Sequence, residues 1–104
     1  MRLFVGLLPL VLALPALAES SIADDCTFEG IDLRGEVKIV ESFADLDVKI
    51  VSSFPDLDVK TVASFPDDCG EWQFVESFPD FTIRYVDSFP DIEIRMVENF
   101  PGLP

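Results

Sequence analysis

Carboxylates are the side chains best suited to chemistry in this 104-residue sequence, which contains 20 aspartates and glutamates but no histidine. Histidine is the commonest general base and a frequent metal ligand. The sequence also lacks a nucleophile elbow, a phosphate-binding loop, an HExxH motif and an EF-hand loop. The carboxylates recur at equivalent positions of a repeat, whereas catalysis needs one asymmetric site with shifted pKa values. We therefore expect no catalytic residues and no enzymatic activity.

Aspartates of the repeat supply hard oxygen ligands that could bind calcium if folding brought them together. The glycine-rich GGxGxD loop of calcium-binding β-rolls is missing, and an aspartate in a turn usually satisfies its own turn. We expect no metal site and no cofactor. The alternative is a calcium-binding acidic β-repeat module, whose first candidate ligands are Asp45, Asp56, Asp80 and Asp91.

Residues 1–18 have the composition of a cleaved secretory signal peptide. They comprise a short positive end, an apolar stretch and a small-residue cleavage pattern: Met1-Arg2, Leu3 to Leu14 and Ala16-Leu17-Ala18. The apolar stretch ends before Pro15 and is shorter than the roughly 20 residues that span a bilayer. We expect cleavage after Ala18 to leave a soluble protein with a flexible segment at residues 19–25, either secreted or periplasmic.

Cys26 and Cys69 would then stand in an oxidising compartment, where a disulfide between them is the default expectation. Closing that loop would stabilise the fold by about 4 kcal/mol on the chain-entropy estimate. The sequence has no CxxC redox pair, and two thiols without histidine make a poor zinc site. A structural disulfide is therefore the role we assign to both cysteines.

The mature chain is strongly acidic. Loss of residues 1–18 removes one basic residue and no acidic one, so the 7 basic and 20 acidic residues become 6 and 20, a net charge of −14. Such a field disfavours phosphate backbones and anionic lipid surfaces. We expect no nucleic acid partner and no membrane insertion, and the acidity is typical of a solvated surface that keeps a small domain soluble.

Residues 26–102 form a repeated β domain, whose units recur with an eleven-residue period from Glu41 onward. Two further strand-like stretches, Phe28 to Leu33 and Glu36 to Val40, precede the first unit and meet at Arg34-Gly35. The unit that holds Cys69 is two residues longer than the others. The units are Glu41 to Val51, Ser52 to Val62, Ala63 to Val75, Glu76 to Val86, Asp87 to Val97 and a truncated Glu98 to Gly102.

Apolar and polar residues alternate within each full-length unit, as a half-buried β-strand requires. In one unit Leu46, Val48 and Ile50 share a face, while Asp47 and Lys49 share the other. An eleven-residue period also suits a supercoiled helix, but the β-branched content and the prolines exclude it. Aspartate and lysine two residues apart on the outer face predict an exposed charge ladder of small individual value.

Most units begin at a Ser-Phe-Pro-Asp turn, in which proline presets φ and aspartate bonds nearby backbone groups. A valine before each turn sits where the alternation would place a polar residue, which suggests that the chain crosses to a second buried face there. We expect the phenylalanine of each turn to plug the core. The alternative is a row of aromatic rings that stack on sugar or a base, which is the less common use of regularly spaced phenylalanine.

The pattern predicts an all-β single domain of about seven short strands, centred near Ile31, Lys38, Val48, Val59, Gln73, Ile83 and Ile94. Eleven residues are too few for one full coil of most β-helices. The units should therefore close into a compact wound β-solenoid or a small barrel.

The run SFPDDCGEWQFVESFPDFTIRYVDSFPDIEIRMVENFPG resembles the septoil-knot domain family of short bacterial proteins, whose members repeat Ser-Phe-Pro-Asp around a Gly-(Glu/Lys)-Trp-Gln segment. The resemblance extends from about Cys26 to Gly102. It implies an all-β chain wound into a deep torus knot, a topology that ordinary chains avoid. It implies no catalytic or binding residues. This sequence departs from the repeat at Ala44, which replaces proline, and at Asp68-Cys69.

These observations favour a small exported structural or interaction module, whose partner is a protein or polymer that the sequence does not identify. The oligomeric state is equally open. The segment Asp67 to Gln73 alone breaks the symmetry of the repeat, so we interpret it, with Trp72, as the spot most suited to a special role. An anchor for the disulfide explains the break equally well.

Overall fold

The computed structural model describes residues 21–104, in which every regular element is a β-strand. The predicted signal peptide, residues 1–18, lies outside the described residues. Within residues 21–104 no helix is long and apolar enough to cross a membrane. The strands are β1 (Thr27–Phe28), β2 (Ile31–Asp32), β3 (Gly35–Ile39), β4 (Leu46–Ile50), β5 (Leu57–Thr61), β6 (Glu71–Phe74), β7 (Phe81–Tyr85) and β8 (Ile92–Met96).

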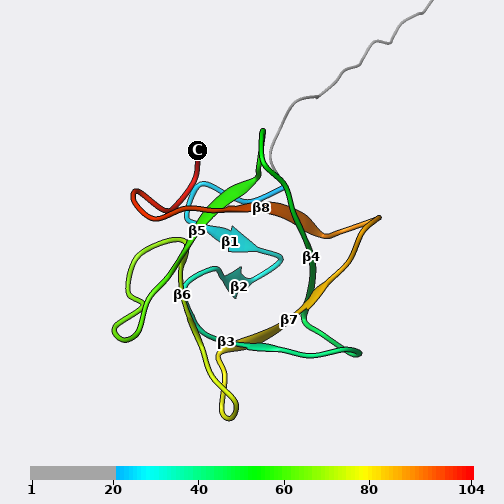
Figure 1. The fold of residues 1–104 in the computed structure, drawn as a ribbon, viewed down its shortest axis with the longest axis vertical. Coiled ribbons are helices and arrows are strands. Elements are labelled where there is room, and N and C mark those ends of the chain that lie inside the picture. Colours follow the sequence, from blue (N-terminus) through cyan, green and yellow to red (C-terminus); the bar gives the residue numbers. More distant parts are fainter. Residues whose placement is uncertain (1–20) are drawn as a thin grey trace, which may run out of the picture.

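Six parallel strands form a closed barrel in the order β3-β6-β5-β8-β4-β7. The chain goes around the barrel in two passes, first through β3, β4 and β5 and then through β6, β7 and β8 (Figure 1). Each second-pass strand lies between two first-pass strands. Every ladder of the barrel therefore joins a strand of one pass to a strand of the other, and closure leaves the barrel with no unpaired edge.

The prediction of an all-β domain closed into a small barrel is confirmed, and each of the seven expected strand centres lies in a strand. The eighth strand arises because the stretch Phe28 to Leu33 is not one strand. It bends at Glu29 and Gly30, both of which have positive φ, and folds into the antiparallel hairpin β1–β2. Glycine adopts this backbone conformation without steric cost.

Alternation within the strands fills the barrel as predicted. In β3, β4, β7 and β8 the first and third residues are buried, while the second and fourth are half-buried on the outside. Closely packed side chains of this kind supply most of the stability of a small domain. The fully buried side chains are Leu33, Val37, Leu46, Val48, Leu57, Val59, Trp72, Ile83, Ile92 and Ile94.

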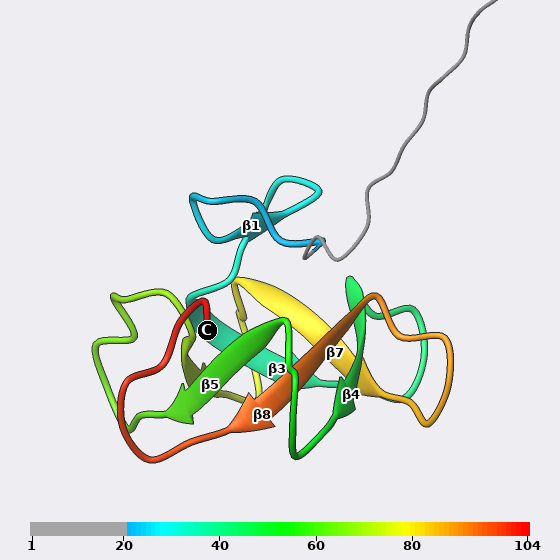
Figure 2. The same cartoon turned by 90° about the horizontal axis from the view of Figure 1, so that it is seen from above.

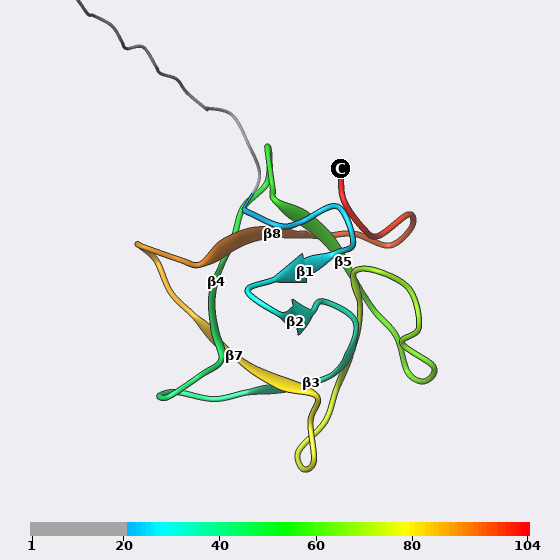
Figure 3. The same ribbon diagram turned by 180° about the vertical axis from the view of Figure 1, so that it is seen from behind.

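The β1–β2 hairpin lies over the middle of the ring and to one side of the barrel (Figures 1, 2 and 3). The predicted disulfide, Cys26–Cys69, ties this hairpin to the segment between β5 and β6. Within the predicted flexible segment, residues 19–25, Ile22 is buried among the core residues. Ile22 therefore packs into the hydrophobic core of the domain.

Leu33 connects the hairpin to the barrel through its backbone. Its N–H donates to the Cys26 carbonyl at 3.0 Å, and its carbonyl accepts from the Gly70 N–H at 3.0 Å. The same carbonyl accepts the buried indole N–H of Trp72 at 3.1 Å. Gly70 must be glycine, because its φ is +84° and a Cβ would collide with the Asp58 carbonyl oxygen.

The turn aspartates bind the neighbouring strand rather than their own turn. The Asp91 backbone N–H donates to the Asp47 carbonyl at 2.7 Å, and the Asp91 carboxylate accepts the Asp47 N–H at 2.8 Å. Asp80 holds Glu36 in the same two-point manner, at 2.7 Å for both bonds. Asp56 holds Glu93 likewise, at 2.7 and 2.8 Å. Each bond of this type fixes a second-pass strand to a first-pass strand.

The predicted charge ladder differs from the observed one in its partners. Each aspartate pairs with an arginine of the adjacent strand, and not with the lysine two residues further along its own strand. Arg84 donates to both carboxylate oxygens of Asp47, at 3.0 and 2.9 Å, and Arg95 to both of Asp58, at 2.9 and 3.2 Å. The physical reason is the register, which places each aspartate directly opposite its arginine.

Asp91→Ala should lower the free energy of unfolding by about 1–2 kcal/mol, because it removes a charge-assisted hydrogen bond between the passes. Asp87→Ala is the matched control. It removes an exposed carboxylate of the same turn, and in residues 21–104 this carboxylate makes no bond like that between Asp91 and the Asp47 N–H. Urea unfolding of the two variants makes the comparison. Equal stabilities would show that the two-point contact contributes nothing.

Candidate interaction surfaces

The phenylalanines of the six turns all point into solvent. They are 80–99% exposed, and their φ values lie between 53° and 58°. The expectation that they plug the core is wrong. The inward positions are already filled by alternate strand residues, so the turns pass outside the barrel with no buried space for another ring. The six, called the aromatic tips below, are Phe43, Phe54, Phe65, Phe78, Phe89 and Phe100.

The backbone conformation of the aromatic tips disfavours phenylalanine. A left-handed φ costs a residue with a Cβ about 1–2 kcal/mol, and glycine or asparagine adopts it more easily. A buried ring would offset that cost through its packing, but these rings are exposed. Folding stability therefore does not account for phenylalanine at all six turns. Strained residues that bring no packing in return are a feature of functional sites.

The six turns project outward around the ring in different directions (Figures 1 and 3). At four of them an exposed carboxylate stands two residues before the aromatic ring: Glu41, Glu76, Asp87 and Glu98. Ser52 and Ala63 occupy the equivalent place at the other two turns. The aromatic tips thus combine an apolar ring with negative charge on a convex outline.

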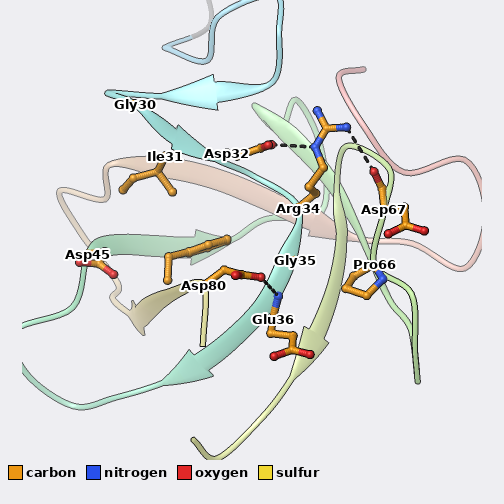
Figure 4. Close-up of a pocket in the computed structure, with 11 residues that line it drawn as sticks. Gly30, Ile31, Asp32, Arg34, Gly35, Glu36, Asp45, Pro66, Asp67 and Asp80 are labelled. Carbon is orange, nitrogen blue, oxygen red and sulfur yellow. Dashed lines mark hydrogen bonds and ion pairs between the residues drawn. The ribbon is translucent and has the colours of Figure 1, made fainter. Parts of the chain in front are cut away.

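A second candidate is a hollow of about 830 Å³ between the hairpin and the mouth of the barrel (Figure 4). Arg34 lies in it, where its Nε donates to Asp32 at 2.7 Å and its Nη1 to the Asp67 carbonyl at 3.2 Å. The Asp80 carboxylate accepts the Glu36 N–H at 2.7 Å. These hydrogen bonds hold the structure together and give the hollow no nucleophile paired with a base.

The four aspartates proposed as calcium ligands belong to four separate turns, and each is bound to a different backbone N–H. Asp56, Asp80 and Asp91 accept from Glu93, Glu36 and Asp47, and Asp45 accepts the Thr82 N–H at 2.9 Å. Across residues 21–104 no three acidic or cysteine side chains are grouped closely enough to hold a metal ion. The structure does not bring these candidate ligands together.

The barrel has a second mouth opposite the hairpin, toward which the arrowheads of β4, β5 and β8 point in Figure 2. Ile39, Ile50, Tyr85 and Met96 end four strands there, and they are 40–52% exposed. Partial burial raises the pKa of Tyr85 above its ordinary value. These residues continue the inward-facing rows of the core, so packing explains their type.

Trp72, in the segment that interrupts the repeat, is fully buried. Its ring packs edge-on against Phe81, with centroids 5.6 Å apart, and against Phe74 at 6.3 Å. Its indole N–H is bound to the Leu33 carbonyl. The break in the repeat thus serves the junction between hairpin and barrel, and Trp72 is not available to a partner.

The aromatic tips are the functional candidate that the sequence reasoning assigned to the core. Four of the tips follow serine and precede proline, whereas Phe43 precedes Ala44 and Phe100 follows Asn99. The available signal was the set of turn residues around each tip, because serine, proline and aspartate mark a turn, where the alternation that buries a strand residue does not apply.

Comparison with known proteins gives one family. A family model described as the 7(1) septoil knot domain matches residues 30–104. No curated protein matches the chain.

Phe78→Asn should leave the free energy of unfolding unchanged or raise it by up to about 1 kcal/mol, because asparagine tolerates the left-handed backbone and no buried contact is lost. Phe81→Ala, three residues away, should cost about 3–5 kcal/mol, since that ring is 3% exposed. Denaturant unfolding measures both. A large loss of stability in Phe78→Asn would restore a folding role to the aromatic tips.

Proposed function

This chain belongs to the septoil knot domain family, and we propose that it is a small exported interaction module that binds a protein or polymer partner through its aromatic tips. The family match covers residues 30–104, which include the barrel and all six tips. The observation that carries the proposal is the pairing of a strained backbone with an exposed ring at every turn. Aromatic side chains that do not serve the core are the usual anchors of protein interfaces.

The separation of turn from barrel supports this proposal. The strands and the turn aspartates hold the fold, so the rings can contact a partner without rearrangement of the core. Such a surface loses little conformational freedom on binding, which favours affinity.

Catalysis has less support. The hollow in Figure 4 presents one arginine, and that arginine is held by Asp32 and the Asp67 carbonyl. The calcium-binding alternative has less support too, because its four aspartates are already bound to separate backbone N–H groups. Both observations favour a module that acts through contact.

Export to the periplasm or the cell exterior is part of the proposal. The Cys26–Cys69 disulfide is compatible with an oxidising compartment.

The full chain, produced in a bacterium with its first 18 residues, should be recovered outside the cytoplasm with Glu19 as its first residue. Mass spectrometry of the intact protein measures this. A product that keeps Met1 and remains in the cytoplasm would contradict export.

The interaction itself is tested with two immobilised variants exposed to exported proteins and polymers of the producing cell. The first variant carries asparagine at all six aromatic tips. The second, Ile50→Thr with Met96→Thr, alters the open barrel mouth and leaves the tips intact. We expect a partner retained by the unaltered protein to be lost by the first variant and kept by the second. Retention by both, or loss only with the mouth variant, would contradict the proposal.

A further inference from the structure

Resting on the proposed function, we propose that the partner of the aromatic tips is a flexible cationic polypeptide, rich in arginine or lysine, that runs around the outside of the barrel. The tips would bind its side chains through the ring faces, and the neighbouring carboxylates would pair with the same cations. The argument comes from the exposure of the rings, the charge around them and their placement on a convex outline.

The ring faces are open to a cation. Phe43, Phe78, Phe89 and Phe100 are 99, 93, 93 and 91% exposed. Within residues 21–104, only Trp72, Phe74 and Phe81 make close aromatic contacts, and none of them is a tip. An arginine or lysine head group is attracted to such a face within about 6 Å of the ring centre.

The charge beside these four rings is negative and unneutralised. Glu41, Glu76, Asp87 and Glu98 are exposed, and the ion pairs found in residues 21–104 involve other carboxylates. No lysine or arginine occurs in any of the six turns. The basic residues of the barrel lie on its strands instead: Lys38, Lys49, Lys60, Arg84 and Arg95. A cation that approaches a tip therefore meets a carboxylate and no competing positive charge.

This combination selects one class of partner. An apolar surface would leave the carboxylates desolvated and unpaired, which costs binding energy. Nucleic acids and anionic lipids repel a mature chain of 6 basic and 20 acidic residues, a net charge of −14. Arginine satisfies both parts of a tip, because its planar head stacks on an aromatic ring while its N–H groups donate to carboxylates.

Flexibility of the partner follows from the placement of the tips. They project in different directions around the ring (Figures 1 and 3), so a flat surface could contact only those on one side. A single exposed contact between a cation and a ring is weak. An extended chain that reaches several tips in turn gains affinity through effective concentration.

The chain provides its own comparison. Phe54 is as exposed as the other tips, but it follows Ser52 and Ser53 in place of an acidic residue. The one aspartate of that turn, Asp56, is half-buried and bound to the Glu93 N–H. The Phe54 tip should therefore contribute least to binding of a cation.

The test is fluorescence anisotropy of a labelled, disordered peptide in which arginine alternates with glycine and serine. The mature, oxidised protein should bind this peptide, and asparagine at Phe43, Phe78, Phe89 and Phe100 should weaken binding at least about thirtyfold. Phe54→Asn should change it less than about twofold. Since Phe78→Asn is expected to keep the fold, unfolding curves recorded in parallel separate loss of binding from loss of structure.

A pair of charge variants separates recognition from general attraction. Glu76→Gln with Asp87→Asn removes two carboxylates beside tips, whereas Asp24→Asn with Glu29→Gln removes two exposed carboxylates near the hairpin. We expect the first pair to weaken peptide binding about tenfold and the second about twofold or less.

Equal weakening by the two pairs, or full binding by the variant that lacks the four rings, would reduce the interaction to net charge and overturn this inference. Absence of any binding would overturn it as well. Binding to phosphatidylcholine vesicles but not to the peptide, with the same dependence on the rings, would replace the cationic polypeptide by a membrane surface. In that case the part of the proposed function that assigns binding to the tips would stand, whereas its protein or polymer partner would be replaced by lipid.

Discussion

Pairing between the two passes of the chain is the constraint on which the rest of the structure depends. No ladder of the barrel lies within a single pass. Gly35 pairs with Trp72, and Val37 with Phe81, so residues about forty positions apart become neighbours. The turn aspartates and the arginine–aspartate pairs join the same two passes. Neither half of the chain can form this sheet alone, and such distant pairing slows folding because loop closure precedes any gain in contacts.

This constraint separates the parts of the repeat unit by role. The strand supplies the buried rows, and the aspartate at its start holds the neighbouring strand. The serine and phenylalanine before it lie outside the barrel, where neither the core nor the ladder restricts their type. The chain makes six turns outside the barrel, one after each barrel strand. It therefore displays six copies of the residue that stands at the tip of the turn. Phenylalanine at that position, in a backbone that disfavours it, is what directs our functional proposals to the turns.

The sequence was sufficient for the strands and for the disulfide, because both follow from local signals. Alternation such as Leu46-Asp47-Val48 is visible within one unit, and only two cysteines exist to pair. The parallel pairing could not be predicted from the residues alone, since five nearly equal strands offer many equivalent registers. The repeat pattern suggested a wound solenoid or a small barrel, but the resemblance to the septoil-knot family was needed to imply a knotted chain, and a model of that family matches residues 30–104.

The candidate site entered the sequence analysis only as the alternative, for a different physical reason. Phenylalanine is usually buried, so its regular spacing predicts packing in the core. The alternation that places Phe81 inside holds only within a strand, and it is interrupted at each turn, where Phe78 faces solvent. Trp72 presents the converse case. It was singled out because it breaks the repeat, yet its role is to fill the core and to donate to the Leu33 carbonyl.

Native-state hydrogen exchange tests the central claim that the two passes form one cooperative barrel which leaves the aromatic tips unconstrained. The account predicts that strand amides of β3, β4 and β5 exchange with the same free energy as those of β7 and β8, because neither pass can open without the other. It also predicts that the backbone amides of the six phenylalanines exchange rapidly. A pass that opens at a lower free energy than its partner, or strong protection at the tips, would contradict it.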